Sequence, residues 1–169
     1  DLDLAIARYV HFDRLQPPFC FAPDGRPDYC GPEDFRALGA RVYRNDGEGR
    51  FTDVTRSAGL AQSVRPALGV LIADLVGDGR PDLYFANDGV PCSLLENLGG
   101  LRFREVAVGA GVAVSGSGTP LAGMGVALAD LDGDQRDDLA VTNFLDRGTV
   151  LFRSIGQGIY QDVSAASGV

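Results

Sequence analysis

The chain has 169 residues, of which 45% are hydrophobic and 22% are charged, a composition typical of a folded domain and not of a disordered one. No stretch approaches the roughly 20 consecutive apolar residues that a membrane helix requires. Fifteen Lys and Arg against 23 Asp and Glu give a net charge of -8, and such an acidic chain repels phosphate backbones, which disfavours nucleic acid as a partner.

The chain opens on two acids, Asp1 and Asp3, followed by a short apolar run. Residues 3–8 (Asp-Leu-Ala-Ile-Ala-Arg) match two later segments, residues 82–87 and 138–143, so we expect a strand in each. In both later segments the strand follows an acidic loop, and the opening residues correspond to positions 7 to 10 of such a loop. We therefore predict Asp1 and Asp3 to belong to a metal-binding loop, and we expect the native protein to extend upstream.

Residues 13–40 interrupt the pattern with prolines, glycines and two cysteines, which predicts an irregular insertion. Cys20 and Cys30 flank a Gly/Pro/Asp-rich loop, and cysteine pairs that close short loops are typical of oxidising compartments. A disulfide there would stabilise the fold by about 3 kcal/mol; the alternative is two unrelated thiols. No C-x-x-C spacing indicates zinc or haem. We expect Cys92, the third cysteine, to be a small buried residue.

An internal repeat is the main signal. Residues 42–60, 94–112 and 151–169 align without a gap. The three segments carry an aromatic residue and two glycines in register, and the aromatic residues lie 52 and 57 positions apart, a spacing that suits propeller blades. The aligned residues are Phe51, Phe103 and Tyr160; Gly47, Gly99 and Gly156; and Gly59, Gly111 and Gly168.

Short apolar runs separated by turn residues indicate strands throughout. In the second repeat the expected strands are residues 68–74, 82–87, 93–97 and 102–107. Four antiparallel strands joined by tight turns form one propeller blade, whereas a sandwich would not repeat a whole four-stranded unit with its loops. The prediction is an all-β fold: one propeller segment over residues 1–169, with three blade units at about 1–60, 68–112 and 124–169, the insertion at 13–40 lying inside the first.

A dense acidic loop lies between the first two strands of the third unit. Residues 130–138 place carboxylates at positions 1, 3, 5 and 9, and the backbone carbonyl of position 7 adds an oxygen. Calcium takes six to eight oxygen ligands in a flexible geometry, and the loop has no soft ligand for zinc or copper. The alternative is a hydrated acidic turn. The predicted calcium ligands are Asp130, Asp132, Asp134, the Arg136 carbonyl and Asp138.

The second unit has a similar loop with one defect. Asp74, Asp78, Asp82 and the Arg80 carbonyl stand at the ligand positions, but Val76 replaces the acid at position 3. Because affinity depends on the number of charged ligands, we expect this loop to bind calcium more weakly than residues 130–138. A titration should then show one strong site and at most one weaker site.

The motifs of both loops resemble a known repeat. Residues 125–138 resemble the FG-GAP or VCBS-type repeat that builds the propeller of integrin α-subunits, and residues 43–60 are similar to the ASPIC/UnbV (cartilage acidic protein-like) group. Residues 28–32 look like the cysteine insertion of that group. The resemblance implies a seven-bladed propeller, calcium in the loops named above, and a secreted, extracellular, periplasmic or cell-surface location. Gln135 departs from the usual glycine at position 6. Three blades cannot close a ring, so we expect the chain to be part of a longer one.

Three functions fit these features. The first is a calcium-binding extracellular scaffold for adhesion or for protein or carbohydrate recognition, which is not an enzyme. The second is a calcium-dependent, polysaccharide-active enzyme on the same propeller; its catalytic candidates are few, since His11 is the sole histidine and the conspicuous acids are assigned to metal. The third is a structural subunit of a larger extracellular or membrane-associated assembly, which exposed apolar faces at residues 4–10 and 150–160 would favour.

Overall fold

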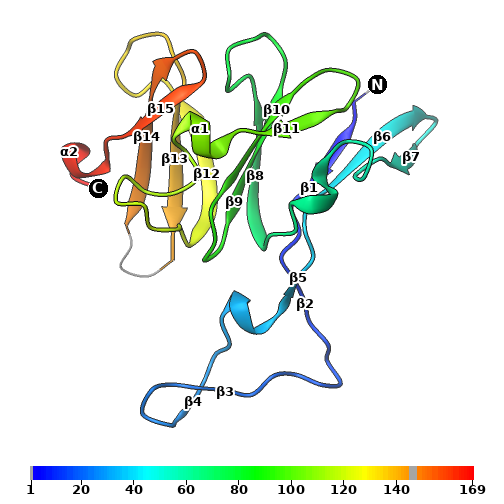
Figure 1. Cartoon of the computed structure of the whole chain (residues 1–169), viewed down its shortest axis with the longest axis vertical. Helices are drawn as coiled ribbons and strands as arrows, with labels where there is room; N and C mark the ends of the chain where they lie inside the picture. The colour runs from blue at the N-terminus through cyan, green and yellow to red at the C-terminus, as the bar shows by residue number, and fades with distance from the viewer. Residues whose placement is uncertain (1, 145–147) are drawn as a thin grey trace.

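The computed structural model describes residues 2–144 and 148–169. Three antiparallel sheets stand side by side, and an arm from the first extends away from them (Figure 1). The predicted all-β fold of propeller blades is confirmed. The prediction for Asp1 falls outside the described residues.

The second and third units are complete four-stranded meanders. The second unit contains β8 (Ala67–Ala73), β9 (Asp82–Asn87), β10 (Ser93–Asn97) and β11 (Phe103–Glu105), and it ends in the short helix α1 (Ala107–Ala110). The third contains β12 (Gly123–Ala129), β13 (Asp138–Asn143), β14 (Thr149–Gly156) and β15 (Ile159–Asp162), followed by α2 (Ser164–Ser167). The strand expected at 102–107 is therefore shorter, because its last residue already begins α1.

The first unit has three strands in the order β1-β6-β7: β1 (Leu4–Ile6), β6 (Arg41–Gly47) and β7 (Arg50–Asp53). The short helix η2 (Leu60–Gln62) follows. In register, β1 corresponds to the second strand of the other units, since it pairs with the strand that leads into the outer hairpin. The arm, residues 7–40, connects β1 to β6 and so begins earlier than the insertion predicted at 13–40.

The arm is built from two small ladders and a disulfide. β2 (Val10–His11) pairs with β5 (Arg36–Ala37), β3 (Cys20–Phe21) pairs with β4 (Pro27–Asp28), and η1 (Pro32–Asp34) lies between. The predicted Cys20–Cys30 disulfide is confirmed, with 5.2 Å between the two Cα atoms. Asp34 lies near both sulfurs, but disulfide sulfurs are not thiolates and cannot ligate a metal as such.

We expect reduction of this disulfide to loosen the arm and leave the blades folded. The arm meets the blades at its base, where the Tyr9 hydroxyl donates to Asp88 at 2.7 Å. The double variant Cys20→Ser/Cys30→Ser should increase amide exchange within residues 12–30 while exchange in β8–β15 stays unchanged. Non-reducing peptide mapping of the parent should yield one linked peptide, and recovery of both cysteines alkylated without reductant would contradict the bridge.

Two apolar cores lie between neighbouring units. One, between the second and third units, includes Tyr84, Leu94, Leu139 and Phe152; the other, between the first and second, includes Val42, Leu60, Leu83, Phe85 and Leu95. Cys92 is buried in the former as a free thiol, as predicted. The fold is thus held by contacts between adjacent blades, in the manner of repeat proteins.

The first and second units each close on a glycine that contacts the outer strand of the next unit. A Cβ on Gly59 would lie 2.9 Å from the Phe103 carbonyl oxygen, and one on Gly111 would lie 2.5 Å from that of Tyr160. Both glycines have positive φ. The residues after them, Leu60 and Val112, are buried. Gly59 and Gly111 are therefore required by close packing of blade on blade.

Candidate metal centre in the acidic loops

The third loop folds around the carboxylate of Asp130. The backbone N–H groups of Gly133, Asp134 and Gln135 donate to it at 2.7, 3.1 and 2.9 Å. The N–H of Gln135 is the main reason that the pKa of Asp130 lies below its usual value, against a smaller opposing effect of desolvation. Gln135 takes the left-handed conformation (φ 68°) that glycine takes at this position in the second loop.

Asp138 ties this loop to two strands. Its side chain is buried at 2% exposure. The N–H of Leu131 donates to its Oδ2 at 3.0 Å, and the N–H of Ser154 on β14 donates to its Oδ1 at 2.8 Å. Each carboxylate oxygen has two lone pairs, so an oxygen that accepts one N–H can still ligate a cation.

Three carboxylates converge in this loop. Asp130, Asp132 and Asp138 each offer an oxygen, and these oxygens lie within 4.8 Å of one another. The Arg153 guanidinium lies 3.9 Å from the Asp132 carboxylate. Like charges at such distances repel one another, and a donor set made only of oxygens suits a hard cation such as calcium. The residues present therefore fit calcium.

Asp134 does not join these three. Its carboxylate pairs with the Arg136 guanidinium and accepts the Arg136 backbone N–H at 2.9 Å. To ligate a cation, Asp134 would have to turn away from that ion pair. Ligation by Asp134 and by the Arg136 carbonyl stays a prediction.

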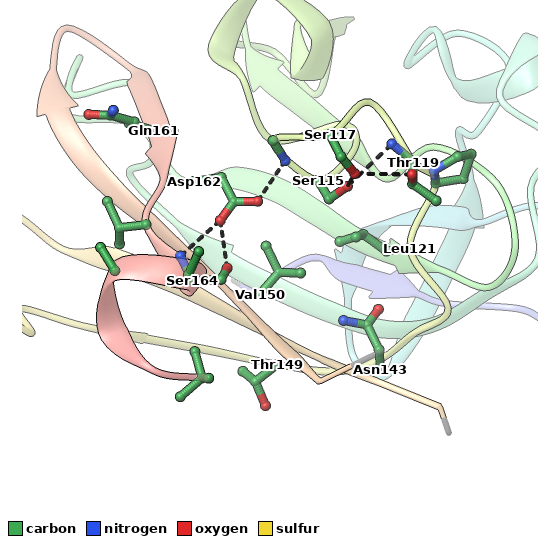
Figure 2. Close-up of a pocket in the computed structure, with 16 residues that line it drawn as sticks. Ser115, Ser117, Thr119, Leu121, Asn143, Thr149, Val150, Gln161, Asp162 and Ser164 are labelled. Carbon is green, nitrogen blue, oxygen red and sulfur yellow. Dashed lines mark hydrogen bonds between the residues drawn. The ribbon is translucent and has the colours of Figure 1, made fainter. Parts of the chain in front are cut away.

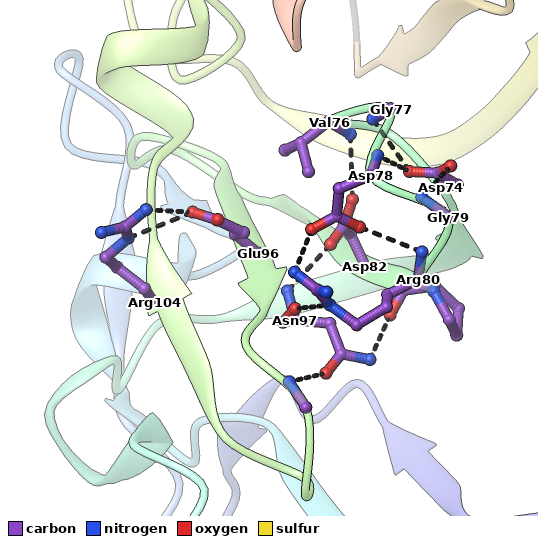
Figure 3. A network of polar contacts seen from close by, with 12 residues as sticks. Asp74, Val76, Gly77, Asp78, Gly79, Arg80, Asp82, Glu96, Asn97 and Arg104 are labelled. Atoms are coloured by element: carbon purple, nitrogen blue, oxygen red, sulfur yellow. Dashed lines mark hydrogen bonds and ion pairs between the residues drawn. The ribbon is translucent and has the colours of Figure 1, made fainter.

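In the second loop, Asp74 organises the backbone as Asp130 does in the third, but no three carboxylates among the described residues converge there (Figure 3). Asp74 accepts the N–H groups of Gly77, Asp78 and Gly79 at 2.8 to 3.0 Å, and Asp78 pairs with the Arg80 guanidinium. Arg80 also donates through Nε to the Asn97 carbonyl at 2.6 Å. The loop thus holds its shape through its own hydrogen bonds.

Asp82 is fully buried at the end of the second loop. It accepts the N–H groups of Leu75, Val76 and Asn97 at 2.9, 3.0 and 2.8 Å. Burial raises the pKa of this carboxyl, while the three N–H donors act in the opposite direction. Asp82 is the counterpart of Asp138, and both connect the loop to the third strand of their unit.

Val76, which replaces the acid at position 3 of the second loop, also packs against the third unit. Within the described residues, the second loop does not bring three carboxylates together as the third loop does. Val76 packs against the core between the second and third units, and a Cβ on Gly158, in the β14–β15 turn, would lie 3.0 Å from the Val76 Cα. This contact was not predicted from the sequence, although an apolar residue among acids in the loop was a visible signal of it.

Asp3 occupies the place of the ninth-position acid in the first unit. The N–H of Asn45 on β6 donates to its Oδ1 at 2.8 Å. This is the same contact that Asp82 makes with Asn97 and Asp138 makes with Ser154. The structure therefore assigns Asp3 a role in joining β1 to β6, and its metal binding stays a prediction.

A cavity of about 680 Å³ lies beside α2 on the third unit (Figure 2). Asp162 accepts the Gly116 N–H at 2.6 Å and both the N–H and hydroxyl of Ser164, so it ties the loop before β12 to the start of α2. Burial would raise the pKa of Asp162, but these hydrogen bonds outweigh it and hold the pKa below its usual value. Asp162 serves to position these two segments.

Comparison with known proteins places the repeat in a family. A family model for the FG-GAP-like repeat matches residues 21–85 and 74–141. The chain belongs to the FG-GAP-like repeat family. Each match extends through an acidic loop into the following strand, so the two FG-GAP-like matches overlap on residues 74–85.

Individual relatives agree with this assignment. Cartilage acidic protein 1 of Xenopus tropicalis is 30% identical over 110 residues, which is 63% of this chain and 16% of the relative. The mouse and human proteins of the same name are each 31% identical over 120 residues, or 68% of this chain and 18% and 17% of theirs. This FG-GAP-like chain thus spans less than a fifth of the relatives it matches. In the part of the chain that the structure describes, no helix is long and apolar enough to cross a membrane.

Proposed function

We propose that this chain is a calcium-stabilised part of an extracellular FG-GAP-like propeller that acts by binding a protein or carbohydrate partner. The observation that carries the proposal is the convergence of Asp130, Asp132 and Asp138. Bound calcium would convert the repulsion among these carboxylates into a link between β12, β13 and β14. Extracellular calcium is abundant enough to fill sites with dissociation constants of about 10⁻⁴ to 10⁻³ M.

Three further observations bear on the candidate functions. The Cys20–Cys30 disulfide is the kind of bond that persists in oxidising compartments. His11 lies exposed on the two-residue strand β2, which belongs to the arm and not to either acidic loop. Val150, Phe152 and Tyr160 are buried between units, whereas Ile155 and Ile159 of the same segment are exposed, at 53% and 39%. The segment at 150–160 thus uses about half of its large apolar side chains for blade packing.

The test is calcium titration of the full chain by calorimetry. The parent should show one strong site, and Asp132→Ala should weaken it about tenfold or more because a charged ligand is lost. Glu48→Ala removes the same charge from an exposed side chain outside the loops and should bind as the parent does. Unchanged affinity in Asp132→Ala, or a melting temperature that chelation does not alter, would refute calcium binding by the third loop.

A further inference from the structure

An arginine at position 7 of each acidic loop joins the loop to the third strand of its unit. In the second loop, Arg80 donates through Nε to the Asn97 carbonyl on β10 at 2.6 Å (Figure 3). In the third loop, Arg136 donates through Nε to the Ser154 carbonyl on β14 at 3.4 Å, a longer and weaker contact. Asn97 and Ser154 correspond in the repeat, so the same contact recurs at the same place in two units.

The acid at position 9 binds the other backbone group of the same strand residue. Asp82 accepts the N–H of Asn97 at 2.8 Å, and Asp138 accepts the N–H of Ser154 at 2.8 Å. The arginine thus binds the carbonyl, and the acid binds the N–H, of a single residue on the third strand. Together they fasten the loop to the strand, which is the link assigned to calcium in the third unit.

Each arginine also pairs with the acid at position 5 of its own loop. The backbone N–H of Arg80 donates to Oδ1 of Asp78 at 3.0 Å, and its guanidinium pairs with Oδ2. Arg136 contacts both oxygens of Asp134 in the same way, with the backbone N–H at 2.9 Å. A guanidinium does not lose its charge in proteins, so each loop contains a permanent cation that neutralises one of its carboxylates.

The two loops differ in what remains for an ion. Residues 74–82 contain three acids and one arginine, a net charge of -2, whereas residues 130–138 contain five acids and one arginine, a net charge of -4. With Asp78 paired, the second loop retains Asp74 and Asp82, and each of these accepts three backbone N–H groups. The third loop retains three convergent acids. Arginine thus supplies a larger share of the compensating charge in the second loop than in the third.

We propose that the arginine at position 7 is an internal counter-ion that holds each loop to its third strand, permanently in the second loop and in exchange with calcium in the third. For the third loop the inference rests on the proposed function, because it uses the same calcium site. Arg80 takes the place of the ion where Val76 has removed a ligand. Arg136 occupies Asp134, so this carboxylate can ligate calcium only after it leaves the guanidinium. The exchange lowers the calcium affinity of the loop, and the loop stays attached to β14 at low calcium.

The exposure of the ion pairs sets the size of the effect. The side chains of Arg136 and Asp134 are 49% and 26% exposed, and those of Arg80 and Asp78 are 46% and 27% exposed. Because water screens pairs of this exposure, each changes an equilibrium by no more than about fivefold. The loops should therefore loosen, and not unfold, when the arginine is replaced.

The counter-ion role is tested by amide exchange of the full chain, with Arg80→Gln and Arg136→Gln measured in chelator and in millimolar calcium. Glutamine keeps a polar side chain and removes the charge. In chelator, each variant should exchange the amide of its own third-strand residue, Asn97 or Ser154, about threefold faster than the parent does. Calcium should restore the parent rate in Arg136→Gln and should leave Arg80→Gln unchanged.

Arg44→Gln is the matched control. Arg44 also pairs with an acid two residues away, Asp46, at 56% and 31% exposure, but it lies on β6 outside both loops. Its replacement should leave the amides of Asn97 and Ser154 as in the parent. Parent-like exchange of both loop variants in chelator, or an equal increase in Arg44→Gln, overturns the counter-ion role. Rescue of Arg80→Gln by calcium overturns the permanence of the second-loop contact.

The exchange with calcium is tested by a double-mutant cycle in calorimetry. Arg136→Gln should raise the calcium affinity about threefold, because the Asp134 carboxylate no longer has to leave a cation. In an Asp134→Asn background the same substitution should have little effect. An equal rise in both backgrounds would show that Arg136 acts through its charge alone, which overturns the exchange. A parent chain that binds no calcium overturns the proposed function and this exchange together, whereas the measurements in chelator decide the counter-ion role independently.

Discussion

Gly111→Ala is expected to lower the free energy of unfolding by about 2 to 5 kcal/mol. An added Cβ would lie 2.5 Å from the Tyr160 carbonyl oxygen, so one blade must move away from the other, at a cost of about 1 to 3 kcal/mol for overpacking. The positive φ of 80° adds about 1 to 2 kcal/mol for a residue with a side chain. Denaturant unfolding measures the sum.

Gly168→Ala separates these two contributions. Gly168 has a φ of 76°, but nothing lies within 4 Å of a Cβ placed on it. The variant should therefore show only the conformational cost of about 1 to 2 kcal/mol. If the two variants were equally destabilised, the contact between the second and third units would not be as close as the structure shows.

Asp82→Ala should destabilise the chain by about 3 kcal/mol or more, even with calcium removed. The substitution leaves three N–H groups, those of Leu75, Val76 and Asn97, without their acceptor. A buried donor left without a partner costs about 1 to 3 kcal/mol. Unfolding in the presence of chelator isolates this structural role from any loss of metal binding.

Asp74→Ala is the matched control, because Asp74 also accepts three backbone N–H groups. The loop around Asp74 is exposed, so water can replace the lost acceptor, and the loss should stay near 1 kcal/mol. A similar loss in both variants would mean that burial of Asp82 does not matter.

The strands and blades could be predicted from the sequence because apolar runs, turn glycines and aligned aromatic residues recur in register. The convergence of acids in residues 130–138 could be anticipated from their spacing alone. The role of Val76 could not, because its partner Gly158 belongs to another unit and is distant in sequence. The ion pairs of Asp78 and Asp134 with arginines two residues onward were also missed, because those arginines were considered only for their carbonyls.

The arm has a consequence for the order in which the units fold. Pairing β1 with β6 closes a loop of residues 7–40, whereas pairing β12 with β13 closes only residues 130–137. Loop-closure entropy makes the first pairing more costly by about 1.3 kcal/mol, and the shorter path through the Cys20–Cys30 bridge recovers only about 0.3 kcal/mol of this. Nucleation should therefore begin in the second and third units, whose contacts are local. The first sheet should then assemble last, on a template that its neighbour has already formed.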